Sequence, residues 1–391
     1  MKPAKPESTT MDKETFVPPT MRALYFSPPP ASEETKSTTA TIAFDADFPT
    51  PQPSFNQYLV KVQAASFSLD ELQAARTLNP TLSIPQIPVH SFCGTVISTP
   101  VEDHQNPFGP RFKIGDSVIG LKNYTLDGAA ADYVLTTEDE LAFKPRNVTA
   151  KEAASIPLPA LTAWHALFAY ARLMDTLIGG TQTKSGLRVL VTSAYDSDAA
   201  IDVIRILRAP RHLLNPGIAA DDETPVWICA VCSSTDQELF LTDQLGVDKV
   251  MVSGSNLEDS FRAHGWEPVD LVVDASGAGE TFRQSHSPHV VKDDGMVLST
   301  VSSSVDAVRN DPRIQEQVAK GKLGSHFVAV RPDGLALQRI VALVETNALR
   351  GRVDRVMDMV DAGLRDILGG RRETGKQCKG KMTVIHVDTS D

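Results

Sequence analysis

The sequence predicts an α/β fold in which a doubly wound parallel sheet accompanies a β-rich part made of short strands. From about residue 149 to 321, apolar residues at helical spacing alternate with short β-branched runs, which is typical of a parallel sheet covered by helices. Before and after this region, short strands are separated by Gly, Pro and Asp turns, which favours a small barrel-like domain. The chain has 391 residues, enough for two domains of ordinary size.

The β-rich part is expected to combine residues 21–148 with residues 322–391, after a disordered tail at 1–20. Residues 28–39 are expected to form a loop, and Ser68–Arg76 a short helix or turn. The other expected elements are strands at Met21–Phe26, Thr41–Phe44, Gln57–Ala65, after the bend that begins at Ile87, within Arg111–Leu121 and within Asp127–Thr137, then strand His326–Val330, helix Leu335–Thr346, strand Arg352–Met357, a helix, a basic turn and strand Met382–Val387.

The middle of the chain, residues 149–321, is expected to form the α/β domain. It begins with two helical stretches around Pro157 and Pro159, and Leu187–Leu207 then reads as strand, tight turn and helix. Residues 208–225 are longer than a usual helix-to-strand connection and predict a surface insertion. Further strands are expected at Val226–Val231, Val269–Gly277 and Gly295–Ser304, and a helix at Asp236–Leu245.

The turn after the strand Leu187–Thr192 has the position of a dinucleotide-binding loop but not its glycines. Such a loop has the pattern G-x-G-x-x-G, because bare backbone lets a pyrophosphate approach a helix N-terminus. Here no glycine occurs between Arg188 and Pro216, and the turn carries Ser193, Asp196, Ser197 and Ala199 instead. The motif alone therefore leaves nucleotide binding open.

Composition excludes several classes of protein. The net charge of -11 and the pI near 5.3 argue against nucleic acid or an anionic membrane as the main partner. No apolar run reaches the roughly 18 residues of a membrane span, and the N-terminus has no apolar signal-peptide core. We therefore expect a cytoplasmic protein. Cys229 and Cys232 form a C-x-x-C, but no second Cys/His pair has zinc-ribbon spacing, so we expect a buried strand there.

Six stretches together resemble one family. They are FKIGDSVIGL (112–121), DGAAADYV (127–134), KPRNVTAKEAASIPLPALTAWHAL (144–167), LGVDKV (245–250), VDLVVDASGAGETF (269–282) and GMVLST (295–300). In their order and spacing the chain resembles the medium-chain dehydrogenase/reductase superfamily, in its zinc-free quinone oxidoreductase and enoyl reductase branch. The resemblance implies a GroES-like substrate domain, a Rossmann domain and a cleft where they meet. It also implies NADPH-dependent reduction of an activated carbon–carbon double bond or a quinone.

The resemblance also implies candidate catalytic residues. His90 is retained from the zinc-binding branch, but Ser91 stands where a Glu is expected. A single His cannot hold zinc, so no zinc is expected and His90 is read as a structural or cleft residue. Ser68, or Glu71 beside Asp70, is a candidate proton donor, the alternative being a turn or helix-cap role. Tyr124 and Asp127 are expected to rim the cleft.

The residues expected to bind the cofactor come from the strand ends and the turn. Thr162 lies where the family places a residue close to nicotinamide. No acid directly follows the second strand, which favours NADP over NAD. The full set of expected cofactor-binding residues is Thr162, Ser193, Ala194, Ser197, Asp198, Ala199, Ser233, Ser234, Ser276, Gly277, Val301 and Phe327.

The negative charge of acidic residues in the turn argues against binding of a dinucleotide. A carboxylate of Asp196 or Asp198 at 4 Å from a phosphate would cost about 4 kcal/mol at an effective dielectric of 20, unless Asp198 caps the helix with its side chain in solvent. The family's Lys or Arg after the second strand is missing, and Arg211 or His212 would have to replace it.

Two functions therefore stay open. One is an NADPH-dependent reductase. The other is a protein that has lost the dinucleotide and carries out a cofactor-free isomerisation or cyclisation, with His90, Glu71, Asp127 or Tyr124 orienting the substrate. The expected partner is a small-molecule substrate of unstated identity. A homodimer through an exposed sheet edge, either Gly295–Ser304 or His326–Val330, is also expected.

Overall fold

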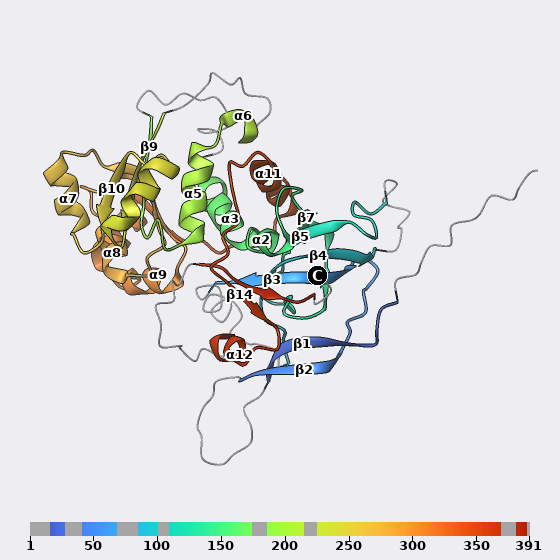
Figure 1. The fold of residues 1–391 in the computed structure, drawn as a ribbon. Helices are drawn as coiled ribbons and strands as arrows, with labels where there is room; N and C mark the ends of the chain where they lie inside the picture. The colour runs from blue at the N-terminus through green and yellow to red at the C-terminus, as the bar shows by residue number, and fades with distance from the viewer. Residues whose placement is uncertain are drawn as a thin grey trace, which may run out of the picture.

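The computed structural model describes residues 16–27, 41–68, 85–100, 109–173, 186–214, 225–368 and 381–388. These residues form a six-stranded parallel sheet, a seven-stranded sheet and a two-stranded ribbon (Figure 1). The predicted α/β fold is confirmed. The expected loop at 28–39, Asp70, Glu71, most of the tail at 1–20, most of the insertion at 208–225 and the basic turn lie outside the described residues.

The six-stranded sheet is parallel throughout. Its order is β10 (Lys249–Val252), β9 (Val226–Cys232), β8 (Leu187–Val191), β11 (Val269–Asp274), β12 (Val291–Ser299) and β13 (Leu323–Phe327). Alternate residues of each strand point to opposite sides of the sheet, and apolar cores cover both sides. Val189 and Val191 of β8 lie in one apolar core, and Leu190 lies in another.

Different helices cover the two faces. α3 (Pro157–Trp164), α5 (Asp198–Arg208), α6 (Arg211–Leu214) and α11 (Gly334–Glu345) contribute to the first core. α7 (Leu257–His264), α8 (Gly279–Gln284), α9 (Ser302–Val308) and α10 (Pro312–Ala319) contribute to the second. Figure 1 shows α5 and α7 to α9 around this sheet.

The seven-stranded sheet joins both ends of the chain. Its order is β14 (Arg355–Asp358), β15 (Thr383–His386), β3 (Tyr58–Phe67), β4 (Ser91–Ser98), β5 (Ser117–Leu121) and β7 (Leu141–Phe143), and β6 (Tyr133–Thr136) also pairs with β3. The antiparallel pairing of β15 with β3 brings the C-terminal strand beside an N-terminal one. The ribbon of β1 (Thr20–Ser27) and β2 (Thr41–Pro49) lies below this sheet in Figure 1, near α12 (Ala362–Leu368).

Helix α2 (Ala150–Ala154) ties two strands of this sheet together. Thr149 and Glu152 form a capping box at its start. At its end, the hydroxyls of Ser66 and Ser91 both donate to the carbonyl of Ala154, at 2.6 and 2.8 Å. The remaining short helices are η1 (Glu138–Glu140), the π-helix η2 (His165–Tyr170), η3 (Thr235–Gln237) and the π-helix η4 (Phe240–Gln244).

Three predicted elements differ from the structure. The expected helix Asp236–Leu245 is present as a continuous helical stretch, but it begins as the 3-10 helix η3 and ends as the π-helix η4, where Leu245 N–H donates to the carbonyl of Phe240, five residues back. The expected strand Gly295–Ser304 starts earlier, at Val291, and its last residues form α9. It pairs with a strand on each side, so it is not an edge.

The third difference concerns the strand that we expected at His326–Val330, in the β-rich part. The structure has it at Leu323–Phe327, where it pairs with β12 and forms one edge of the parallel sheet. Only Leu323 of this strand is buried, so no alternation of apolar and polar residues marks the strand in the sequence. The division of the chain into a tail, a β-rich domain and an α/β domain otherwise stays a prediction. None of the helices among the described residues could cross a bilayer.

Candidate functional site

The carboxyl ends of β8, β11 and β12 meet at a buried carboxylate, Asp274. Its side chain is 0% exposed. Thr192 Oγ1 and Ser276 Oγ each donate to Oδ1 at 2.6 Å, and Ser299 Oγ donates to Oδ2 at 3.1 Å. The backbone N–H of Ser276 adds a bond at 3.2 Å. One buried carboxylate therefore holds the ends of three strands in register, because a buried charge needs such partners.

This network positions four residues that we expected to bind a cofactor. Ser276 is bonded to Asp274 directly, and Val301 N–H donates to Ser299 Oγ at 3.1 Å. Gly277 has φ +65, and a Cβ placed there would lie 3.2 Å from Val301 Cγ1. Phe327, at the end of β13, is the register partner of Ser299. The edge thus presents small side chains and bare backbone, as a bound dinucleotide requires.

The glycine-poor turn still closes tightly. Ser193 takes φ +52, a left-handed conformation that favours glycine, and its carbonyl accepts from the N–H groups of Asp196 and Ser197. Ala194 N–H donates to the carbonyl of Val231, which attaches the turn to β9. Ser197 caps α5 by accepting from Ala200 N–H at 3.3 Å. The 11-residue helix α5, which includes Ala199, therefore starts directly after the turn, and its N-terminus favours an anion.

Asp198 takes neither of the two orientations that we considered. It is 3% exposed and faces the C-terminal part of the chain, so the expected cap in solvent is wrong. Arg352 Nη1 lies 3.0 Å from Oδ1, and Met382 N–H donates to Oδ2 at 3.0 Å. Burial raises the pKa of Asp198, and the charge of Arg352 opposes that rise. Both oxygens are therefore committed to partners within the protein.

Two cations that the sequence did not point to approach the turn through Tyr195. Arg352 Nη1 donates to the carbonyl of Tyr195 at 3.4 Å, and the guanidinium lies 5.5 Å from the centre of its ring. Lys381 Nζ lies 5.0 Å from the same ring. These residues are far from the turn in sequence and follow no local period, so only the fold reveals them.

The end of β9 contacts the same turn through Gln237. Gln237 Nε2 donates to Ser233 Oγ at 2.8 Å and to Asp196 Oδ1 at 3.5 Å, and Ser233 N–H donates to Gln237 Oε1. Ser234 immediately precedes η3. The Ser233–Ser234 segment and the turn therefore lie side by side, with a neutral amide where a cation was sought. We expected Arg211 or His212, on α6, to replace the missing Lys or Arg, and Arg211 is buried.

Two of the candidate catalytic residues contact each other. The rings of His90 and Tyr124 are 4.6 Å apart, and both are buried. Ser68, at the end of β3, is also buried. Asp127 is exposed instead and accepts a hydrogen bond from Ile87 N–H at 3.0 Å.

The hydroxyl of Thr162 forms a hydrogen bond within its own helix, where it donates to the carbonyl of Leu158 at 2.8 Å.

His165 is a buried residue that was not among our candidates. Its Nε2 lies 3.6 Å from Asp333 Oδ2, and this proximity lowers the pKa of Asp333.

Comparison with known proteins identifies relatives of this chain. Residues 245–364 match the family model described as zinc-binding dehydrogenase. The chain is 28% identical over 354 residues to a "Probable zinc-binding oxidoreductase, mitochondrial" of Arthroderma benhamiae, covering 90% of this chain and 92% of that one. It is 29% identical over 345 residues to "NAD(P)H oxidoreductase RTN4IP1, mitochondrial" of Dictyostelium discoideum, covering 81% and 89%.

A solved structure shares the fold. The quinone oxidoreductase of Coxiella burnetii superposes with a TM-score of 0.64 at 20% identity, over 94% of this chain and 99% of that one. The chain belongs to the medium-chain dehydrogenase/reductase superfamily. The resemblance read from the sequence is thus confirmed. The cytoplasmic location stays a prediction, since the names of two relatives place them in mitochondria.

Members of this superfamily divide by their use of zinc, so the cysteines and histidines matter. Among the residues that the structure describes, no three His, Cys, Asp or Glu side chains are grouped as metal ligands. Cys229 and Cys232 are free thiols whose side chains belong to the two different cores. Burial raises the pKa of the Cys229 thiol to about 12. The C-x-x-C therefore contributes to packing on both faces of β9.

Proposed function

We propose that the protein is an NADPH-dependent reductase that transfers hydride to an activated carbon–carbon double bond or a quinone. The observation that carries the proposal is the commitment of Asp198 to Arg352 and Met382. It removes one of the two carboxylates that argued against a bound pyrophosphate. The name of the Dictyostelium relative, an NAD(P)H oxidoreductase, supports the same reading.

The residues present fit a dinucleotide. Ser276, Gly277 and Val301 would hold it at the carboxyl edge of the sheet, where a Cβ at Gly277 would crowd the side chain of Val301. Ser193 and Ala194 would hold it at the turn, with the N-terminus of α5 facing the phosphates. Arg352 neutralises Asp198 beside the turn, and Lys381 brings positive charge to the turn through its contact with Tyr195. Phosphates require such compensation.

The bound NADPH would supply a hydride. Adding that hydride to an enone leaves an enolate, which must take up one proton to complete the reduction. Ser68, His90, Tyr124 and Asp127 are the described candidates to orient the substrate and supply that proton. His90 and Tyr124 are in ring contact, so they would act as one wall of the site.

We also propose that the reaction needs no zinc. Ser91 follows His90 where the zinc-binding branch has an acid, and its hydroxyl is bonded to the carbonyl of Ala154. Metal analysis of the purified protein tests this, and a stoichiometric zinc content would contradict it.

The second candidate function, a cofactor-free isomerisation or cyclisation, has one observation in its favour. Asp196 keeps a carboxylate in the turn, and Gln237 Nε2 donates to its Oδ1 at 3.5 Å. Fluorescence titration with NADPH separates the two functions. The reductase should show energy transfer from its tryptophans and saturable binding. No change in fluorescence at about millimolar NADPH, together with turnover of a substrate without nicotinamide, would favour the second function.

A further inference from the structure

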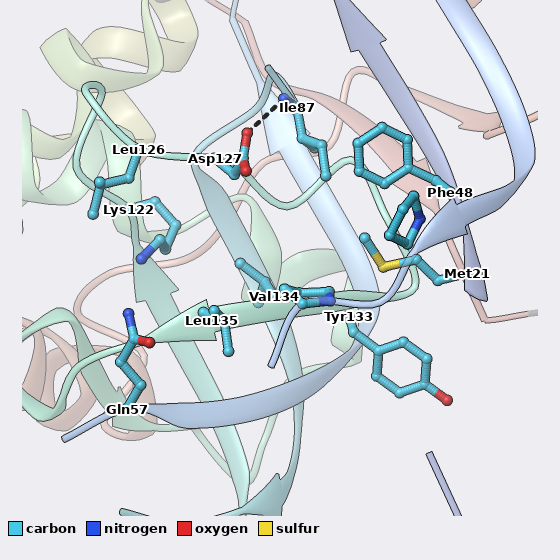
Figure 2. Close-up of a pocket in the computed structure, with 13 residues that line it drawn as sticks. Met21, Phe48, Gln57, Ile87, Lys122, Leu126, Asp127, Tyr133, Val134 and Leu135 are labelled. Atoms are coloured by element: carbon cyan, nitrogen blue, oxygen red, sulfur yellow. Dashed lines mark hydrogen bonds between the residues drawn. The ribbon is translucent and has the colours of Figure 1, made fainter. Parts of the chain in front are cut away.

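A pocket of about 160 Å³ lies in the β-rich part, between the β1–β2 ribbon and strand β6 (Figure 2). Met21 and Phe48 of the ribbon and Val134 and Leu135 of β6 form its apolar walls. None of the residues that we expect to bind the cofactor lines it. The pocket is therefore separate from the expected cofactor site, although it includes Asp127, which we also expected to rim the cleft.

One polar group of this pocket keeps an uncompensated charge. Asp127, at the mouth, accepts one hydrogen bond, from Ile87 N–H to Oδ1. Its Oδ2 has no hydrogen-bond partner within the described part of the chain. The ammonium of Lys122, which also lines the pocket, is buried and lies 2.6 Å from Glu140 Oε2, so that pair is neutral overall. The pocket consequently has a net negative charge at Asp127.

The polar group on the other side is an amide. Gln57 Oε1 accepts from the hydroxyl and the N–H of Ser54, at 2.8 and 3.1 Å. These bonds fix the amide beside the pocket, where Figure 2 shows it below Lys122. An amide adds polarity without charge, so the preference for the sign of a ligand's charge comes from Asp127.

Size and charge together select a class of ligand. A volume near 150 Å³ with apolar walls accommodates a single six-membered ring, and a carboxylate at the mouth favours a cationic end. We propose that this pocket binds a small apolar amine, with its ring between Phe48 and Leu135 and its ammonium paired with Asp127. Such a ligand would occupy the β-rich part while the carboxyl edge of the parallel sheet stays accessible.

Fluorine NMR titration of the full chain with fluorobenzylamine tests this proposal, with fluorobenzyl alcohol and fluorobenzoate as matched probes. We expect the amine to bind with a Kd of about 1 to 10 mM, the alcohol more weakly, and the benzoate not at all. Asp127→Asn keeps an acceptor for Ile87 N–H but removes the charge. Because exposed ion pairs are weak, it should reduce affinity for the amine about threefold.

Two further variants separate the proposal from general effects. Asp47→Asn removes a charge from the exposed side of β2, beside Phe48, and should leave binding of the amine unchanged. Leu135→Trp fills the pocket and should abolish binding, while its circular dichroism and NADPH titration match those of the parent. Equal binding of amine and benzoate, displacement of the amine by NADPH, or unchanged binding in Leu135→Trp would each overturn the proposal.

Discussion

At the scale of single residues, the carboxylate of Asp196 is the remaining obstacle to a phosphate in the turn. It is half-buried and shares Gln237 with Ser233. Asp196→Gly removes the charge and should tighten NADPH binding about tenfold, since one partly exposed charge near a phosphate costs on the order of 1 kcal/mol or more. Fluorescence titration measures this change. Asp236→Gly, an exposed acid just after β9, is the control, and an unchanged Kd for Asp196→Gly would show that its carboxylate points away.

Asp202 predicts a dependence of stability on pH. It is buried on α5 with Arg205 Nη1 at 3.5 Å, and burial raises its pKa to about 7. The folded state keeps a proton that the unfolded state has lost between its ordinary pKa, near 4, and about pH 7, so stability falls as pH rises through that range. Asp202→Asn should raise Tm at pH 8 by several degrees and change it little at pH 4. Asp293→Asn, an exposed acid, should have no such effect, and equal shifts at both pH values would contradict the assignment.

At the scale of elements, Asp274 links three strand ends, and its removal should affect all of them. Asp274→Ala leaves the hydroxyls of Thr192, Ser276 and Ser299 without their common acceptor, which should cost roughly 2–4 kcal/mol of stability. Asp274→Asn keeps an oxygen, and the hydroxyls can turn to accept from its amide, so its loss should be smaller. Thermal unfolding ranks the variants, and the KM for NADPH should rise in the same order. A rise in KM without any change in Tm would mean that Asp274 acts on the cofactor directly rather than by holding the three strand ends together.

The elements predicted correctly are those whose burial is periodic. The β8–turn–α5 unit was readable because β8 is buried on both faces and α5 repeats apolar residues at helical spacing. Strand β13 was misplaced because it has one buried residue at a sheet edge. The helix expected at Asp236–Leu245 is present, but its π-helical end was not predictable because buried Leu241 and Leu245 have α-helical spacing, whereas the backbone there forms bonds five residues back.

At the scale of the whole molecule, the sequence predicted which residues lie at the strand ends but not which group neutralises Asp198. Ser276, Gly277 and Val301 were predictable because they follow buried strands, and such strand ends meet at one edge of a parallel sheet. Asp198 was not, because its partners lie at 352 and 382, after the chain has completed the parallel sheet. Its orientation depends on a long-range contact that no local pattern encodes.

The ion pair between Arg352 and Asp198 can be tested by substitution. Arg352→Met leaves Asp198 buried without its ion-pair partner, which should cost about 3–5 kcal/mol of stability. Adding Asp198→Asn should restore most of it, because the amide can still accept from Met382 N–H. Without Arg352, the pKa of Asp198 rises further, so protonation relieves the single variant and its deficit in Tm should shrink as pH falls. Unfolding of both single variants and the double variant at pH 5 and pH 8 measures the coupling. Additive losses would show that Arg352 stabilises the protein through Tyr195 alone, and NADPH titration of the double variant would then reveal whether the turn needs the cation itself.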